Sequence, residues 1–134
     1  MIYLDNAATS RFKPKCALDA LLLDVSHSAN SGRGSHDEAV DKSIRIQKCR
    51  DYLLYMLGAS EEYSLVFTKN CTEALNLAIF GLINGGEKVV TSTNEHNSVL
   101  RPLYNLKSEG KISLDVVKAD GSGHIRLEDV EKCA

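Results

Sequence analysis

The sequence predicts an α/β fold, because short apolar runs and helical patterns alternate along its second half. Three apolar runs have the length of strands, at 64–68, 88–92 and 113–119, and each is followed by polar residues and a helical pattern. This repetition favours parallel strands joined by right-handed crossover connections. With 134 residues, 43% of them hydrophobic and 25% charged, the chain has the composition of one globular domain.

The first part of the chain is predicted to be helical. Apolar residues recur at helical spacing from 14 to about 25, and Pro14 is well placed near the start of that helix. The segment 27–36 is polar, contains two glycines and three serines, and is predicted to be a loop. A second amphipathic helix is expected over 37–57, with Gly58 as its C-terminal cap.

The second part is predicted to continue the α/β alternation. Helices are expected over 71–83 and 97–109, and the pattern at 127–133 indicates the start of another. Three strands are too few for a complete doubly wound sheet. We therefore expect residues 1–134 to form one incomplete domain, with a helical segment at 1–58 and an incomplete α/β sheet at 59–134.

Composition excludes several classes of function. Sixteen basic and eighteen acidic residues give a net charge of -2 without blocks of like charge, which argues against nucleic acid or an anionic membrane as partner. The four cysteines are scattered and lack metal-ligand spacing, so no zinc site or disulfide framework is expected, and reduced thiols in the cytoplasm fit best. Asp5 comes too early for a signal peptide, and no apolar run approaches the roughly 20 residues that span a bilayer.

The stretch VFTKNCTEALNLAIFGL predicts an anion site at the start of a helix. With Asn70 as N-cap, Glu73 falls at the third helical position, which is a variant of the capping box. The backbone N–H groups of Cys71 and Thr72 are then unpaired at the positive end of the helix dipole, and the hydroxyl of Thr72 adds a donor. Such an arrangement binds phosphate groups.

Two other interpretations apply to this stretch. It is also compatible with an ordinary capped helix decorated with polar residues. Lys69 resembles a phosphate-binding lysine, but the motif G-x-x-x-x-G-K-[ST] does not occur in the sequence, which argues against a P-loop.

A second polar segment, TSTNEHNSVLRPL, follows the predicted strand at 88–92. Because the carboxyl ends of parallel strands lie at one edge of a sheet, Glu95 and His96 are expected beside Cys71 and Thr72. An imidazole there can stack on a flat ligand and exchange protons near neutral pH. A lone histidine is, however, more often a surface or capping residue.

Three segments together carry a family resemblance. YLDNAATS (3–10), FTKNCTEALNLAIFGL (67–82) and EHNSVLRPL (95–103) resemble, in order and spacing, the N-terminal third of class V pyridoxal-phosphate enzymes of fold type I. The similarity is greatest to the cysteine desulfurase-like group. It implies a partial three-layer α/β/α sheet of the large domain, preceded by N-terminal helices, and pyridoxal phosphate as cofactor.

The resemblance implies a set of cofactor residues. Asn70, Cys71 and Thr72 match the segment that holds the cofactor phosphate through backbone N–H and hydroxyl groups. Many members of the family have a small or hydroxylated residue in place of Cys71, so this chain departs from the pattern in one side-chain contact. His96 matches the residue that stacks on the pyridine ring and assists proton transfer.

The same resemblance implies residues that contact substrate or a partner subunit. Ala8 and Thr9 would line the substrate pocket. Asn30, Arg33 and His36 match a loop that borders the dimer interface, and Arg33 is the predicted substrate contact among them. Their other interpretation is an ordinary polar loop that contains glycine. The resemblance also implies a homodimer.

The family's activity needs segments that these 134 residues do not contain. They are the lysine of an S-x-H-K-like segment that carries the cofactor, the aspartate that pairs with the pyridine nitrogen, and the mobile cysteine that attacks the substrate sulfur. The resemblance implies removal of sulfur from L-cysteine, giving L-alanine and an enzyme persulfide. We expect the chain alone to lack that activity, and the end of the sequence inside a helical pattern suggests truncation.

Alternative functions remain at this stage. One is another class V enzyme, such as a selenocysteine lyase, an aminotransferase or an epimerase. Another is a noncatalytic binding or interaction module. The uncovered apolar surface of an incomplete sheet also predicts self-association.

Overall fold

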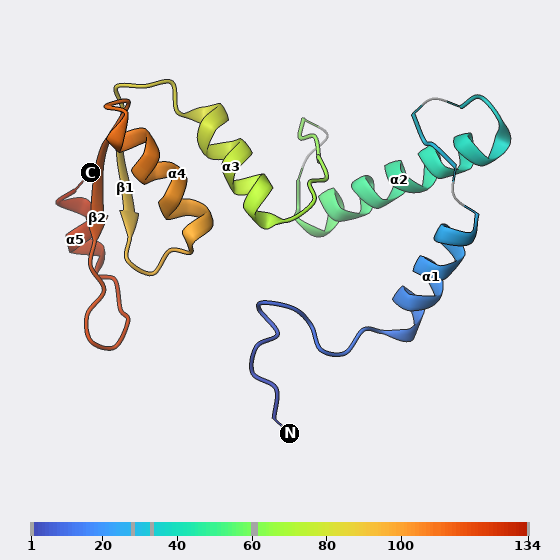
Figure 1. Ribbon diagram of the computed structural model, residues 1–134, viewed down its shortest axis with the longest axis horizontal. Helices are drawn as coiled ribbons and strands as arrows, with labels where there is room; N and C mark the ends of the chain where they lie inside the picture. The colour runs from blue at the N-terminus through green and yellow to red at the C-terminus, as the bar shows by residue number, and fades with distance from the viewer. Residues whose placement is uncertain (1, 28, 33, 60–61, 134) are drawn as a thin grey trace. The chain divides into compact units, whose positions relative to one another are not determined.

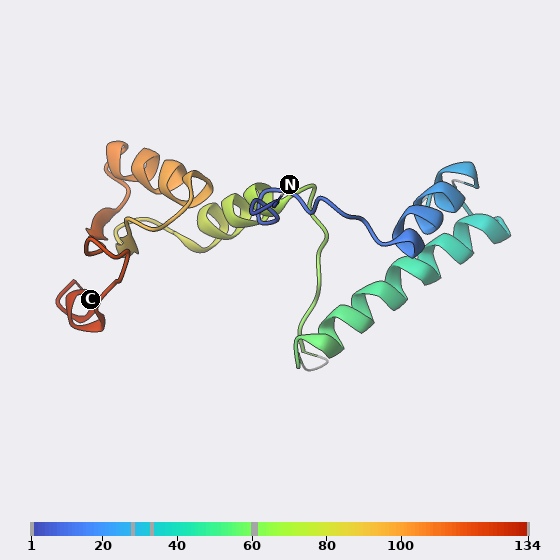
Figure 2. The same ribbon diagram turned by 90° about the horizontal axis from the view of Figure 1, so that it is seen from below.

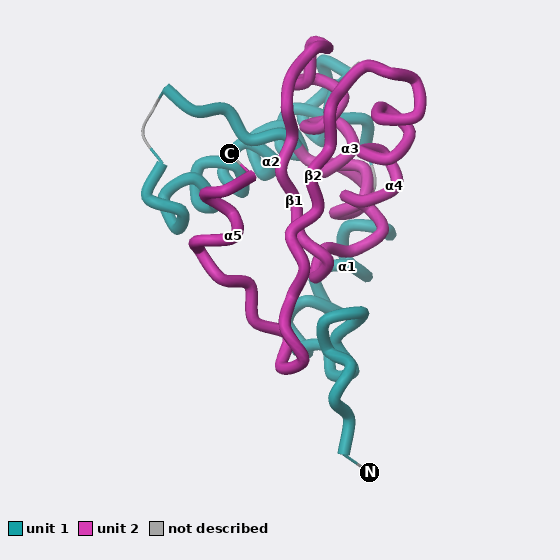
Figure 3. Tube along the Cα trace, turned by 90° about the vertical axis from the view of Figure 1, so that its left-hand side faces the viewer, with its two compact units in different colours: residues 1–66 teal, residues 67–134 magenta. Residues whose placement is uncertain are grey.

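The computed structural model shows five helices and two strands in the described part of the chain (Figures 1 and 2). The described residues are 2–27, 29–32, 34–59 and 62–133. They form two compact units, residues 1–66 and residues 67–134 (Figure 3). None of the described helices is both long and apolar enough to cross a membrane.

The first unit contains the two predicted helices, α1 (Lys15–Ser26) and α2 (Asp37–Met56). Pro14 is the residue before α1, as its fixed backbone angle favours. At the end of α2, Gly58 has φ +65°, its N–H donates to the carbonyl of Tyr55, and the N–H of Ala59 donates to that of Leu54. These bonds form a Schellman motif. Glycine is favoured there because the motif requires a left-handed backbone conformation, which glycine adopts without steric cost.

The first unit has little core of its own. Ala39 on α2 is buried, and Lys42 on α2 pairs with Asp24 near the end of α1. The apolar side of α1 is exposed to solvent, along Leu18, Leu21, Leu22, Leu23 and Val25. A leucine-rich helical face of this kind is stabilised only when another surface covers it.

The second unit is a β–α–β arrangement with a helix before it and one after it. The elements are α3 (Cys71–Leu82), β1 (Lys88–Ser92), α4 (Asn97–Ser108), β2 (Ser113–Val117) and α5 (Leu127–Glu131). The two strands pair in parallel, with Lys88 opposite Ser113 and Ser92 opposite Val117. The strands lie between α4 and α5 (Figure 2), which gives a small three-layer arrangement. These elements confirm the predicted parallel α/β pattern.

The core of the second unit lies between α4 and the strands. It consists of Leu103, Leu106, Ile112 and Leu114. Partly buried side chains from α3 and its C-cap, from α4 and from both strands pack against it, namely Ile79, Ile83, Val89, Val99 and Val116. Because α3 and α4 share this core, their N-terminal ends are held on one side of the same unit.

The predicted strand at 64–68 is wrong. This segment is irregular, and no described strand pairs with it. Its apolar pattern suits a strand, but a strand exists only when a neighbour supplies the hydrogen-bonded ladder. Val66 is 76% exposed, so its side chain is not covered as it would be in a central strand.

The third predicted strand is shorter than expected. The prediction ran to 119, but β2 ends at Val117. Beyond it, the N–H of Ala119 donates to the side-chain oxygen of Thr93 at 2.9 Å instead of to a strand backbone. The hydroxyl of Thr93, in the loop after β1, therefore takes the place of a strand carbonyl as the acceptor, and the strand ends before this residue.

The turn between α3 and β1 is closed by one carboxylate. Glu87 accepts hydrogen bonds from the N–H groups of Asn84 (3.1 Å) and Gly85 (2.7 Å). These two backbone donors hold the pKa of Glu87 below its ordinary value of 4.5. The ionised side chain thereby fixes the position at which the chain leaves α3 and enters the sheet.

Candidate functional site

The start of α3 is capped as the sequence predicts. The side-chain oxygen of Asn70 accepts a hydrogen bond from the N–H of Glu73 at 2.9 Å. The carboxylate of Glu73 accepts one from the N–H of Lys69 at 2.7 Å, one residue before the position that a capping box uses. The hydroxyl of Thr68 donates to the carbonyl of Asn70. These bonds fix the backbone on both sides of the first turn.

The cap leaves two backbone donors at this helix end without a partner. Within the described part of the chain, no hydrogen bond occupies the N–H of Cys71 or of Thr72. Both residues are exposed. Two unpaired N–H groups at the positive end of a helix dipole favour an anion, and the hydroxyl of Thr72 lies on one of those residues.

His96 is the N-cap of α4, in the loop that follows β1. Its Nδ1 accepts a hydrogen bond from the N–H of Ser98 at 3.1 Å and lies 3.0 Å from the hydroxyl of Ser98. Because Nδ1 is the acceptor of this backbone bond, the neutral ring carries its proton on Nε2. His96 is therefore a capping residue, and its Nε2 is left for other partners. Glu95 is exposed beside it.

Thr72 and His96 line the same hollow, which has a volume of about 370 Å³ and lies between the first turns of α3 and α4. The other residues of its lining are Asn76, Asn97, Ser98, Arg101 and Pro102. Asn70 and Cys71 are outside the lining, at the helix start next to it. The described lining includes one basic residue, Arg101, and no acidic residue, so its charge suits an anionic ligand.

The sequence prediction assigned a role to only two residues of this lining. Asn76, Ser98, Arg101 and Pro102 lie in the segments that carry the family resemblance, but their spacing did not show that they meet. One local signal was available. Pro102 stands inside a helical pattern, where its missing N–H leaves a carbonyl one turn earlier without its usual donor.

The predicted substrate residues belong to the first unit. The N–H groups of Ala8 and Thr9 both donate to the carbonyl of Asp5, and the hydroxyl of Tyr3 donates to the carbonyl of Thr9. Arg33 lies outside the described residues. Nearby in the sequence, the side chain of Asn30 accepts from the N–H of Gly32 at 2.8 Å. The substrate roles of Ala8, Thr9 and Arg33 stay predictions.

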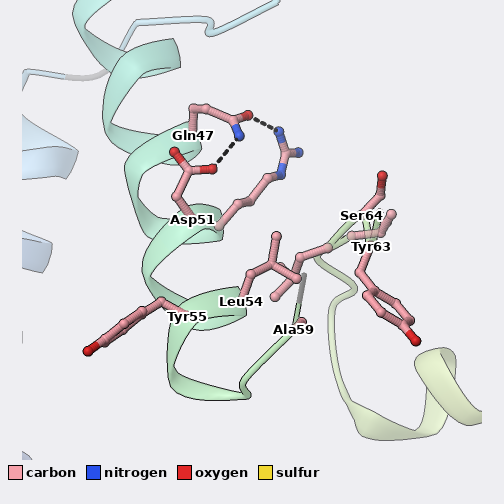
Figure 4. A pocket seen from close by; sticks show the side chains of 10 residues that line it. Gln47, Asp51, Leu54, Tyr55, Ala59, Tyr63 and Ser64 are labelled. Carbon is pink, nitrogen blue, oxygen red and sulfur yellow. Dashed lines mark hydrogen bonds between the residues drawn. The ribbon is translucent and has the colours of Figure 1, made fainter. Parts of the chain in front are cut away.

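A second hollow, of about 780 Å³, lies in the first unit (Figure 4). It is formed by α2, Ala59 and the segment 63–66. Gln47 donates to Asp51 at 2.7 Å, and Arg50 donates to Gln47 at 3.4 Å, so polar side chains on its helical wall bind one another. Its remaining lining includes Leu54 and Leu65. The sequence prediction gave this region no functional role.

Comparison with known structures identifies the fold. The apo structure of a cysteine desulfurase from Thermococcus onnurineus NA1 is 33% identical to this chain, with a TM-score of 0.84 over 98% of the chain and 33% of that protein. The structure of DndA from Streptomyces lividans is 31% identical, with a TM-score of 0.71 over 98% of the chain and 37% of that protein. The chain therefore has part of the fold-type I architecture that was predicted.

The chain belongs to the class-V aminotransferase family, whose model matches residues 2–133. A probable cysteine desulfurase from Pyrococcus abyssi is 32% identical over 98% of the chain and 33% of the relative. One from Borreliella burgdorferi is 30% identical over 98% of the chain and 32% of the relative. The chain thus spans about a third of the length of these relatives, and the predicted family is confirmed.

Proposed function

We propose that this chain forms the cofactor-phosphate part of a cysteine desulfurase, with pyridoxal phosphate as the ligand. The observation that carries the proposal is the shared hollow of Thr72 and His96 at the starts of α3 and α4. The names of the similar proteins, cysteine desulfurase and probable cysteine desulfurase, favour this activity over the other class V reactions.

The donors at the helix start fit a phosphate. The N–H groups of Cys71 and Thr72 and the hydroxyl of Thr72 are donors, and the side chain of Asn70 keeps the third N–H of the turn, that of Glu73, occupied. Because backbone groups supply most of the contact, Cys71 does not need to be the small or hydroxylated residue that many family members have at this position. The start of α3 therefore still suits a phosphate, although Cys71 departs from the family pattern.

His96 fits the position beside the cofactor ring. Its cap bond fixes Nδ1, so the ring has one defined tautomer with the proton on Nε2. A fixed imidazole can stack on a flat ring and can hold or donate one proton at Nε2. Bound pyridoxal phosphate supplies the electron sink for the reaction, and the cofactor-bearing lysine and the sulfur-accepting cysteine of the family lie in segments that these 134 residues do not contain.

We propose that the complete reaction is removal of sulfur from L-cysteine, giving L-alanine and an enzyme persulfide. These 134 residues by themselves are expected to bind the cofactor phosphate without turnover. Ala8, Thr9 and Arg33 are the proposed substrate contacts. None of the lysines among the 134 residues lies in the segment that would carry the cofactor.

Replacing Thr72 with Val tests the phosphate site. The change keeps the shape of the side chain and removes a hydroxyl that would bind a charged group, so the affinity for pyridoxal phosphate should fall about tenfold or more. Titration calorimetry measures the affinity, and Thr91→Val, on β1 outside the hollow, is the matched control. Equal affinities for Thr72→Val and the wild-type chain would contradict the assignment.

We also propose that the chain self-associates through its exposed apolar surfaces. The leucine face of α1 is uncovered, and on α3 the side chains of Leu77, Phe80 and Leu82 are exposed. Sedimentation velocity over a range of concentrations should show oligomers whose fraction rises with concentration. A monomer at every concentration would contradict this proposal and leave the phosphate site unaffected.

A further inference from the structure

Pro102 leaves a carbonyl of α4 without its helical donor. In an uninterrupted helix the N–H of residue 102 would donate to the carbonyl of Ser98, four residues earlier. Proline has no N–H, so this bond is missing inside α4. Ser98 is only 7% exposed, which restricts the water that can replace the donor. The carbonyl therefore needs a partner from elsewhere in the fold.

Asn76 on α3 supplies that partner. Its Nδ2 donates to the carbonyl of Ser98 at 3.3 Å and to the carbonyl of Thr72, on its own helix, at 2.8 Å. The two protons of one amide group thus bind one carbonyl on each helix. Thr72 is itself a proposed phosphate contact, and the N–H of Ser98 donates to Nδ1 of His96, the proposed ring contact.

We propose that Asn76 is a positioning residue, which replaces the donor missing at Pro102 and thereby fixes the separation between Thr72 and His96. The amide joins α3 to α4 at the hollow itself, whereas the apolar core joins the helices further along. The structural part of this inference stands on the hydrogen bonds alone. Its consequence for ligand binding rests on the proposed function.

The joint role of Asn76 and Pro102 gives a double-mutant cycle. Asn76→Leu keeps a similar size, raises helix propensity and removes the donor, so it should lower the folded-to-unfolded equilibrium constant about tenfold. In a Pro102→Ala background the N–H of residue 102 is restored and binds the carbonyl of Ser98. The same Asn76→Leu change should then lower the constant less than about threefold.

Urea denaturation followed by circular dichroism measures the four chains of the cycle. The cycle cancels the packing lost with the proline ring, because that loss is common to both chains that carry Pro102→Ala. Asn105→Leu, at an exposed position of α4 outside the hollow, is the matched control and should have little effect. Equal losses from Asn76→Leu in both backgrounds would overturn the inference.

A variant that does not fold still gives an answer. If Asn76→Leu is unfolded and the double variant with Pro102→Ala is folded, the inference is supported. If both are unfolded while Pro102→Ala alone is folded, the added N–H has not replaced the amide, and the inference is overturned.

Ligand binding separates a positioning role from a general structural one. In the proposed site the hydrogen-bond donors for phosphate lie at the start of α3, whereas the ring of pyridoxal phosphate also contacts His96 on α4. Asn76→Leu should therefore lower the affinity for pyridoxal phosphate about tenfold and the affinity for inorganic phosphate less than about threefold. Equal weakening of both ligands, or of neither, would overturn the positioning role. If the wild-type chain binds neither ligand, the proposed function fails, and the denaturation cycle still decides the structural inference.

Discussion

Replacing Thr72 with Asp should reduce the affinity of the chain for pyridoxal phosphate by at least about 100-fold, because two like charges about 4 Å apart repel by roughly 4 kcal/mol near a protein surface. The same change should leave α3 folded. An acidic residue in the first turn of a helix is favourable by about 0.3–1 kcal/mol, since it faces the positive end of the dipole. Binding and stability are therefore expected to change in opposite directions.

Thr72→Asn is the control for this experiment, because it is close in shape to Asp and carries no charge. The Thr72→Asn chain should bind pyridoxal phosphate nearly as tightly as the wild-type chain does, unlike the Thr72→Asp chain. Added salt should also narrow the difference between the two variants, since ions screen exposed charges. Unchanged binding by Thr72→Asp, measured by titration calorimetry with circular dichroism as the check on folding, would place the ligand elsewhere.

Replacing Leu103 with Ala should destabilise the second unit by about 2–5 kcal/mol, which is the usual range for a buried leucine. Leu103 is 3% exposed and lies in the apolar core that α4 shares with the strands. The loss is large compared with the marginal stability of small domains. Urea denaturation followed by circular dichroism measures it.

Leu127→Ala is the matched control, since Leu127 lies on α5 of the same unit and is 71% exposed. It should change the free energy of unfolding much less than Leu103→Ala does. Similar losses for the two variants would mean that the core between α4 and the strands does not hold this unit together.

Features governed by neighbouring residues could be predicted from the sequence. Asn70 and Glu73 stand three residues apart, and their spacing was enough to predict the cap of α3. Gly58 marked the end of α2 because its left-handed backbone suits a Schellman motif. The parallel pairing of β1 and β2 followed from the helix between them.

Features that depend on distant contacts could not be predicted in the same way. The segment 64–68 has the pattern of a strand, but strand formation requires a partner, and periodicity contains no information about that partner. The contact between Asn76 and Ser98 joins residues 22 positions apart. Pro102 indicated that a carbonyl needed a donor, and only the fold shows which side chain provides it.

The residues of the predicted site came partly from helix-capping rules and partly from the family resemblance. Helix capping gave the unpaired donors at Cys71 and Thr72. The place of His96 at the edge of the sheet suggested a ligand contact, and the resemblance identified the ligand as the pyridine ring. The structure adds that His96 is itself a helix cap, which fixes its tautomer. His96 is therefore both a helix cap and a residue of the hollow.

The most direct test of the central claim is a ¹H–¹⁵N NMR titration of the chain with pyridoxal phosphate. The phosphate site predicts that the largest shifts occur at the backbone amides of Cys71 and Thr72 and at the ring nitrogens of His96, with inorganic phosphate moving the first two alone. Shifts centred on other residues, or saturable binding that leaves these groups unmoved, would contradict the account.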